Sequence, residues 1–221
     1  MTDFEERLKS AATLENTFIK SFNKHCEDYQ IIKYGIESTA LRDVHKLVRS
    51  CRDSTSKFIR YIPDSVIINT SDAERGTTLI EFKAAKTGVR EDSFFRQVQS
   101  ECRGMKPPLT SKEDIFNIEK DALKLYLDLN TIGVKTIVVA YAHFRGKSSR
   151  LFAQFVENIG ICNSYNPNIR GRNIGSGTWL SNVNLASFKK VGTIFNEVFN
   201  IDTDVLLAVQ KDVIQAFEAQ G

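Results

Sequence analysis

The sequence predicts an α/β fold with a central mixed β-sheet flanked by helices and a C-terminal helical extension. Three observations indicate it. Apolar residues recur at helical spacing near both ends of the chain. Two apolar runs flank a polar turn at 71–76, as in a β-hairpin. The continuous apolar run KTIVVAYAHF at 135–144 is typical of a strand buried on both faces of a sheet.

The first half of the chain contains most of the predicted sheet. Apolar stripes predict helices over 2–28 and 38–52. Three extended segments follow, at 57–62, 64–70 and 77–84. A short helix is expected around 91–102, and Ser111 is expected to cap a longer helix reaching Leu129, because apolar residues there keep a 3.6-residue period. The buried strand at 135–142 completes this part.

The sequence predicts fewer strands in the second half of the chain than in the first. A helix is expected near 148–158, and two more near 184–199 and 203–219, the last capped by Asp202. Between them, residues 160–182 are expected to form a long loop rich in Asn, Gly and Arg. Such a loop can contact base edges and phosphates, and an ordinary surface excursion explains its composition equally well. With 221 residues and 42% hydrophobic content, one domain over 1–221 is expected.

Composition excludes several classes of protein. No segment reaches the roughly 18 consecutive apolar residues of a membrane span, and the acidic N-terminal segment does not resemble a signal peptide. The four cysteines are far apart and form no zinc-binding pattern. We therefore expect a soluble, intracellular protein in which each cysteine is a small, reduced core residue. The net charge of +3 is too small to indicate nucleic-acid binding by itself.

The central hairpin places charge inside apolar strands. If its turn is centred between Asp72 and Ala73, paired residue numbers add up to 145, so Asp64 faces Glu81. Facing carboxylates destabilise a sheet unless a cation lies between them, and Mg²⁺ is commonly held by one or two carboxylates. Lys83 follows Glu81 by two residues and therefore emerges on the same face of the strand. The three groups together suit attack of water on a phosphodiester. A surface hairpin with Glu81 and Lys83 side by side in water is the structural alternative.

These residues resemble a known family. Pro63–Asp64 followed by Glu81–Phe82–Lys83 resembles the motif of the PD-(D/E)xK nuclease superfamily, to which restriction-endonuclease-like enzymes belong. The resemblance covers about 37–144 and implies the order helix, three strands, helix, strand. It implies that Asp64 and Glu81 bind the metal, that Lys83 is catalytic, and that a helix glutamate assists. Glu37 is the first candidate for that glutamate and Glu15 the second, and Glu119 or Lys120 is the candidate for a polar position on the following helix.

The predicted function is therefore Mg²⁺-dependent endonucleolytic cleavage of double-stranded DNA by a homodimer. The extra helices and the Asn/Arg-rich loop favour a sequence-specific, restriction-like enzyme. A Holliday-junction resolvase or homing-type nuclease of the same superfamily is the alternative, as is a nucleic-acid-binding protein on this fold without catalysis. Six basic residues are the predicted phosphate contacts: Lys86, Arg90, Arg145, Lys147, Arg170 and Arg172.

Overall fold

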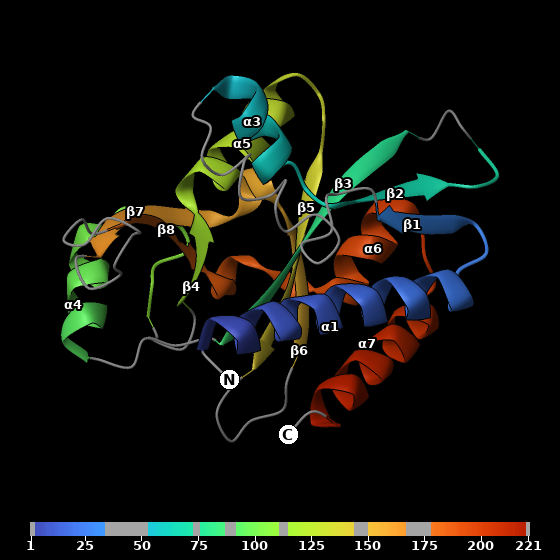
Figure 1. Cartoon of the computed structure of the whole chain (residues 1–221). Coiled ribbons are helices and arrows are strands. Elements are labelled where there is room, and N and C mark those ends of the chain that lie inside the picture. The colour runs from blue at the N-terminus through green and yellow to red at the C-terminus, as the bar shows by residue number, and fades with distance from the viewer. Residues whose placement is uncertain are drawn as a thin grey trace.

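The computed structural model confirms the predicted class: a mixed, open sheet of six strands is flanked by helices, and a smaller sheet of three strands lies beside it (Figure 1). It describes residues 3–33, 53–72, 76–86, 92–110, 115–143, 150–166 and 178–219.

The six-stranded sheet has the order β1-β2-β3-β5-β6-β9. Its first three strands are antiparallel neighbours, β5 runs parallel to β3, and β6 and β9 are again antiparallel to their neighbours. Strand β5 is buried from Thr136 to Ala142, as its continuous apolar run predicts. The strands are β1 (Tyr29–Lys33), β2 (Ser65–Asn69), β3 (Thr77–Lys86), β5 (Thr136–His143), β6 (Arg150–Phe155) and β9 (Lys189–Lys190).

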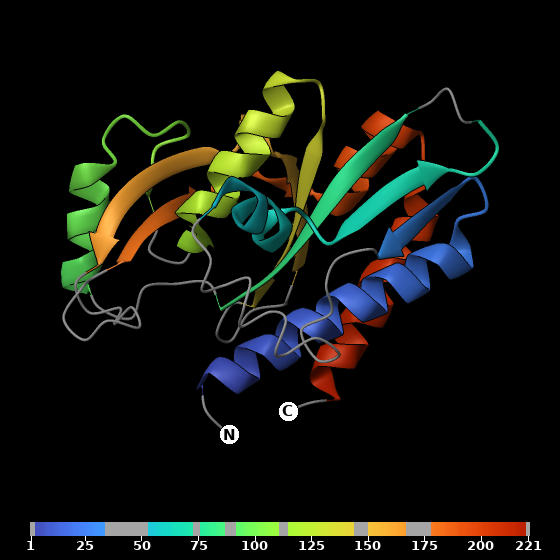
Figure 2. The same ribbon diagram turned by 45° about the horizontal axis from the view of Figure 1, so that its top comes forward.

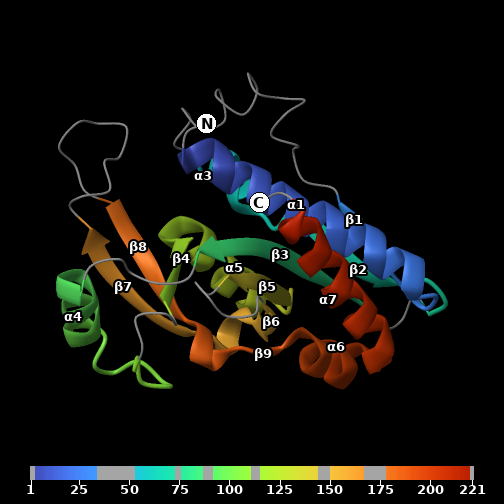
Figure 3. The same ribbon diagram turned by 90° about the horizontal axis from the view of Figure 1, so that it is seen from below.

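Three helices cover one face of this sheet: α1 (Asp3–His25), α6 (Val191–Phe199) and α7 (Thr203–Glu218). Figure 3 shows α1 and α7 side by side beneath it. Aromatic packing forms the centre of this layer. The ring of Phe18 on α1 lies 5.2 Å from that of Phe82 on β3 and 5.9 Å from that of Phe195 on α6. The predicted cap of α7 is confirmed, because the Asp202 side chain accepts a hydrogen bond from the Asp204 backbone.

Helices α3 (Ser54–Tyr61) and α5 (Lys120–Thr131) cover the opposite face (Figure 1). Their buried side chains pack on the residues of β5 that point away from α1, Val138, Ala140 and Ala142. Because side chains alternate along a strand, Ile137, Val139 and Tyr141 enter the first layer instead. Residues of β3 that point the same way enter the layer that contains α5.

The three-stranded sheet contains β4 (Ile115–Glu119), β8 (Thr178–Asn184) and β7 (Gly160–Asn166), in that order. Helix α4 (Asp92–Glu101) packs on it through a separate apolar cluster. Figure 2 shows this sheet and α4 extending to one side of α5, away from β1 and β2. The cluster consists of Val98, Cys102, Met105, Leu109 and Ile115.

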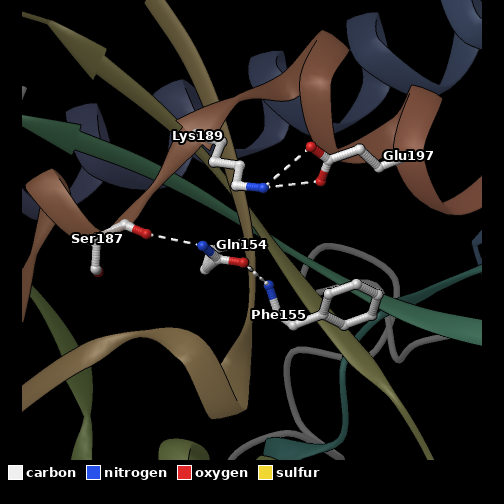
Figure 4. Close-up of polar contacts among 5 residues, drawn as sticks. All are labelled: Gln154, Phe155, Ser187, Lys189 and Glu197. Carbon is white, nitrogen blue, oxygen red and sulfur yellow. Dashed lines mark hydrogen bonds and ion pairs between the residues drawn. The ribbon is translucent and has the colours of Figure 1, made fainter.

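Polar contacts hold the segment between β8 and β9 against β6, and β9 against α6 (Figure 4). The side-chain amide of Gln154 donates to the carbonyl of Ser187 at 2.8 Å, and its oxygen accepts from the Phe155 backbone at 3.0 Å. Lys189 pairs with both carboxylate oxygens of Glu197, at 3.1 and 2.8 Å. The short 3₁₀ turn Leu185–Ser187 is thereby fixed to β6.

Several predicted elements are wrong. Residues 57–62 lie mostly in helix α3, not in a strand: Phe58 and Ile59 are exposed and Tyr61 is buried, so their apolar side chains do not line a half-buried strand. The first strand is instead β1, where Tyr29 and Ile31 are buried and their neighbours are exposed. Helix α1 and strand β1 thus precede residue 37, where the resemblance to the family begins. The helix predicted over 38–52 lies outside the described residues.

The second half holds more strand than predicted. Residues 115–119 form β4 before α5 begins, residues 150–155 form β6 instead of a helix, and residues 160–182 contain β7 and most of β8 instead of one long loop. In each segment pairing with a distant strand overrides the local pattern. The next helix begins at Val191 instead of 184. Helices α1, α4, α6 and α7 and strands β2, β3 and β5 lie broadly where the sequence predicts them.

The cysteines differ from one another. Cys26 is buried and free, as expected. Burial raises the pKa of its thiol. Cys102 is disulfide-bonded, which corrects the expectation that every cysteine is a reduced core residue. The reducing compartment remains a prediction, and this disulfide counts against it.

Candidate active site

The β2–β3 hairpin has the predicted register. Ser65 pairs with Ile80 and Ile68 pairs with Thr77, so the residue numbers of each pair add up to 145. Asp64 directly precedes β2, and the same register places it opposite Glu81. The hairpin therefore brings both acidic residues to one end of its paired segment. A shift by one residue would have separated them onto opposite faces.

Glu81 and Lys83 form an ion pair on β3. Glu81 is 9% exposed, while the Lys83 side chain retains 31% of its accessible surface. Both face the layer that contains α5, since they pair in register with Val138 and Ala140. Phe82 between them points into the α1 layer, because side chains alternate along a strand. Glu81 is thus buried beside a half-buried Lys83, and the pair is not fully exposed on a surface hairpin.

The Asp64 carboxyl has a raised pKa of about 6. Desolvation by the surrounding protein is the largest cause, although the residue as a whole is exposed. The negative charges of Glu81 and then Glu15 raise this pKa further, and Lys83 and Lys33 lower it by less. These influences show that several charged groups surround Asp64.

Lys83 keeps its positive charge because of its acidic neighbours. Burial lowers the pKa of its ammonium group, but the charge of Glu81, the hydrogen bond to it and the charge of Asp64 together raise the pKa above its ordinary value. Glu119 adds to the rise. Lys83 is therefore a cation held beside carboxylates, suited to attracting a phosphate.

Tyr126 lies on α5, and its hydroxyl donates a hydrogen bond to the Glu81 side chain. Its side chain is 2% exposed. Burial raises the pKa of its hydroxyl well above the usual range, and the charges of Glu81, Asp64 and Glu119 raise it further. The sequence analysis did not select Tyr126. The available signal was a tyrosine on the apolar face of an amphipathic helix, because a buried hydroxyl needs a polar partner.

Glu15 on α1 approaches from the other layer. Its carboxylate accepts a hydrogen bond from the Ser65 hydroxyl at 3.2 Å and pairs with Lys33 on β1 at 3.1 Å. Its charge also contributes to the raised pKa of Asp64. Glu15, the second candidate for the helix glutamate, therefore lies near Asp64. Glu37, the first candidate, lies outside the described residues.

Glu119 precedes α5 and accepts a hydrogen bond from the Tyr61 hydroxyl at 2.8 Å. This contact joins α3 to the start of α5. The negative charge of Glu119 also raises the pKa of Lys83 and that of Tyr126. Lys120, the alternative for this polar position, is exposed at the first residue of α5.

The donor set suits a hard divalent cation that keeps part of its water shell. Asp64 and Glu81 supply two carboxylates whose mutual repulsion a cation would relieve, and Mg²⁺ needs no more than one or two. Within the described ranges, no three His, Cys, Asp or Glu side chains are grouped to hold an ion by themselves. Asp64 and Glu81 thus fit Mg²⁺ with water and phosphate oxygens as further ligands, and they do not fit a closed protein cage.

One of the six predicted phosphate contacts lies on a described strand. Lys86 is the last residue of β3. The other five, Arg90, Arg145, Lys147, Arg170 and Arg172, lie outside the described residues.

No protein-family model matches the chain, and a search of curated proteins found no match either. Among the helices that the structure describes, none is sufficiently long and apolar to cross a membrane.

Proposed function

We propose that the protein is a Mg²⁺-dependent endonuclease of the PD-(D/E)xK type that hydrolyses phosphodiester bonds in double-stranded DNA. One observation carries this proposal: the hairpin register brings Asp64 opposite Glu81, and Glu81 is paired with Lys83. The order of elements supports it in part, because α1, β1, β2, β3, α5 and β5 give helix, three strands, helix and strand once three other elements are set aside. Helix α3 lies between β1 and β2, and helix α4 and strand β4 lie between β3 and α5.

In this proposal Asp64 and Glu81 hold the cation. When bound, the cation lowers the pKa of a water molecule and offsets charge on the phosphate. Lys83 has a separate role: its ammonium, kept charged by Glu81 and Asp64, contacts the scissile phosphate and stabilises the negative charge that develops there. The apolar side chains of α5 and β5 exclude water behind these groups and strengthen their electrostatic effect.

Duplex DNA and a homodimer complete the proposal. One small active site cuts one strand, so cleavage of both strands is most simply achieved by two copies. We favour a sequence-specific, restriction-like enzyme, in which the three-stranded sheet and α4 widen the surface beside the active site.

The test is incubation of long duplex DNA with Mg²⁺ and the parent protein, Asp64→Asn, Glu81→Gln or Lys83→Met. We expect discrete fragments from the parent and a loss of at least about 100-fold in rate for each variant, the scale on which removal of one stabilising group acts. Lys189→Met and Glu197→Gln are matched controls, because they break an ion pair of the same type on an exposed surface. These should cleave at the parent rate.

Two results would contradict the proposal. Equal cleavage by the parent and all three site variants would show that the reaction occurs elsewhere. A parent protein that binds duplex DNA equally with and without Mg²⁺, and leaves it intact, would identify the non-catalytic binding protein instead.

A further inference from the structure

Two side chains donate hydrogen bonds to the carboxylate of Glu81, and they differ in burial and in flexibility. Lys83 lies two residues away on the same strand and retains 31% of its side-chain surface. Tyr126 comes from α5 and is 2% exposed. The tyrosine ring packs in the apolar cluster with Ala122, Leu123 and Val138, so its position is set by the core. The lysine has a long side chain with partial access to solvent, so it can leave Glu81 for another anion.

This difference matters for a carboxylate that binds a metal. If Lys83 moves toward a phosphate, Glu81 loses its ion pair but keeps the hydroxyl of Tyr126. A donor fixed in the core holds the carboxylate in one orientation, so less conformational freedom is lost when a cation binds. Without this donor, the Glu81 side chain would lose more conformational freedom when the cation binds.

We propose that Tyr126 is a positioning residue: its buried hydroxyl orients Glu81 for divalent cation binding and holds it there when Lys83 turns to the substrate. This inference rests on the proposed function. Tyr126 does not contact the cation or the reacting phosphate. It acts only through Glu81.

The test is calorimetric titration with Ca²⁺, which probes metal binding without cleavage, on the full chain of the parent, Tyr126→Phe and Tyr29→Phe. Tyr126→Phe should bind Ca²⁺ about tenfold more weakly, the low end of the effect of removing a group that orients a metal ligand. Tyr29→Phe is the matched control, because Tyr29 is also buried but packs against Phe199 in the α1 layer. It should bind as the parent does.

A second readout separates positioning from general damage. The Mg²⁺ concentration giving half-maximal cleavage should rise about tenfold in Tyr126→Phe, with a rate at saturating Mg²⁺ within about threefold of the parent rate. Binding of duplex DNA without metal should not change. Tyr126→Leu, which also removes the hydroxyl, carries the same expectation if Tyr126→Phe does not fold.

The outcomes distinguish this inference from the proposed function. If the parent binds Ca²⁺ and cleaves DNA, and Tyr126→Phe binds and responds to Mg²⁺ equally well, the inference is overturned alone. The same holds if Tyr29→Phe weakens binding as much as Tyr126→Phe. A parent that binds neither cation and cleaves nothing overturns both.

Discussion

Lys83 and Glu81, two residues apart on β3, form an ion pair on the face of the sheet that α5 covers. Burial of one charge without the other would be costly, whereas the pair with the Tyr126 hydrogen bond is tolerated. Glu81 also lies near Asp64, and this second negative charge is offset only in part by Lys83. The excess of acid over base is what leaves the site suited to a cation.

Cleavage should depend on pH through Asp64. Its pKa of about 6 means that the ionised form is lost as pH falls through that value. We expect the cleavage rate to fall about tenfold for each pH unit below about 6 at low Mg²⁺, because a protonated carboxyl does not bind the cation. Rates measured from pH 4.5 to 8 test this. Raising Mg²⁺ should move the decline to lower pH, and a decline that ignores Mg²⁺ would contradict the assignment.

The same raised pKa predicts that Asp64 destabilises the folded protein near neutral pH. An unfolded aspartate has a pKa of about 3.9. Between the pH values that match these two pKa values, the folded state binds more protons than the unfolded state. The free energy of unfolding therefore falls as pH rises through this range and then levels off above about pH 6. Asp64→Asn should therefore be more stable than the parent at pH 7 by on the order of 1 kcal/mol, after a discount for solvent screening of this exposed residue.

Calorimetric melting without Mg²⁺ checks this expectation. The melting temperature of Asp64→Asn should exceed that of the parent by about 2–4 °C at pH 7, and the two should agree near pH 4. A variant less stable than the parent at pH 7 would show that Asp64 is stabilised by its neighbours.

Glu15 and Lys33 should shift the pKa of Asp64 in opposite directions. The charge of Glu15 raises it and that of Lys33 lowers it. Glu15→Gln should therefore lower this pKa, and Lys33→Met should raise it, each by a fraction of a unit because one partly screened charge is removed. Carboxyl carbon NMR across a pH titration measures both changes. Shifts of the same sign would contradict the arrangement around Asp64.

The relative positions of Asp64 and Glu81 could be predicted more accurately than the order of helices and strands, because they depend on a local hairpin. The turn fixes which residues of β2 and β3 face each other, so the positions of Asp64 and Glu81 followed from counting outward from Asp72 and Ala73. Tyr126 and Glu15 could not be placed in the same way. They reach the site from helices whose packing depends on the whole core.

The strands of the second half show the limit of local patterns. The apolar residues Ile115 and Ile118 continue the helical period of α5, yet they lie on β4, because pairing with β8 satisfies the backbone there. In β7 the run from Cys162 to Asn166 has apolar residues only at Cys162 and Tyr165 and no alternation of apolar and polar residues, so it resembles a loop. Pairing with a strand distant in sequence therefore determines that these segments are strands.

Gly160, at the start of β7, should not tolerate a side chain. A Cβ there would lie 2.8 Å from the backbone oxygen of Lys106 and 3.5 Å from the Cβ of Asn184. Gly160→Ala should destabilise the protein by about 1–3 kcal/mol, since backbone must move to relieve the contact. Gly192→Ala on α6 is the control, because its nearest contact would be Leu206 at 4.0 Å. Urea denaturation compares them, and an equal effect of both substitutions would contradict the steric explanation.

Asn184 should be more important for stability than its position at the end of β8 suggests. It is fully buried, its amide donates to the carbonyls of Pro107 at 2.9 Å and Pro108 at 3.3 Å, and its oxygen accepts from the Ala186 backbone at 3.0 Å. Asn184→Ala removes the partners of all three groups, and buried polar groups left unpaired cost about 1–3 kcal/mol each.

We expect Asn184→Ala to lower the free energy of unfolding in urea by at least about 2 kcal/mol, since more than one contact is lost together. Asn158→Ala, at an exposed position in the turn after β6, is the matched control and should change stability by less than about 0.5 kcal/mol. Asn184→Asp discriminates further. A carboxylate keeps the bond from Ala186 but cannot donate to the two proline carbonyls, so this variant should be destabilised at pH 7 as well. An aspartate variant as stable as the parent would show that these carbonyls do not depend on Asn184.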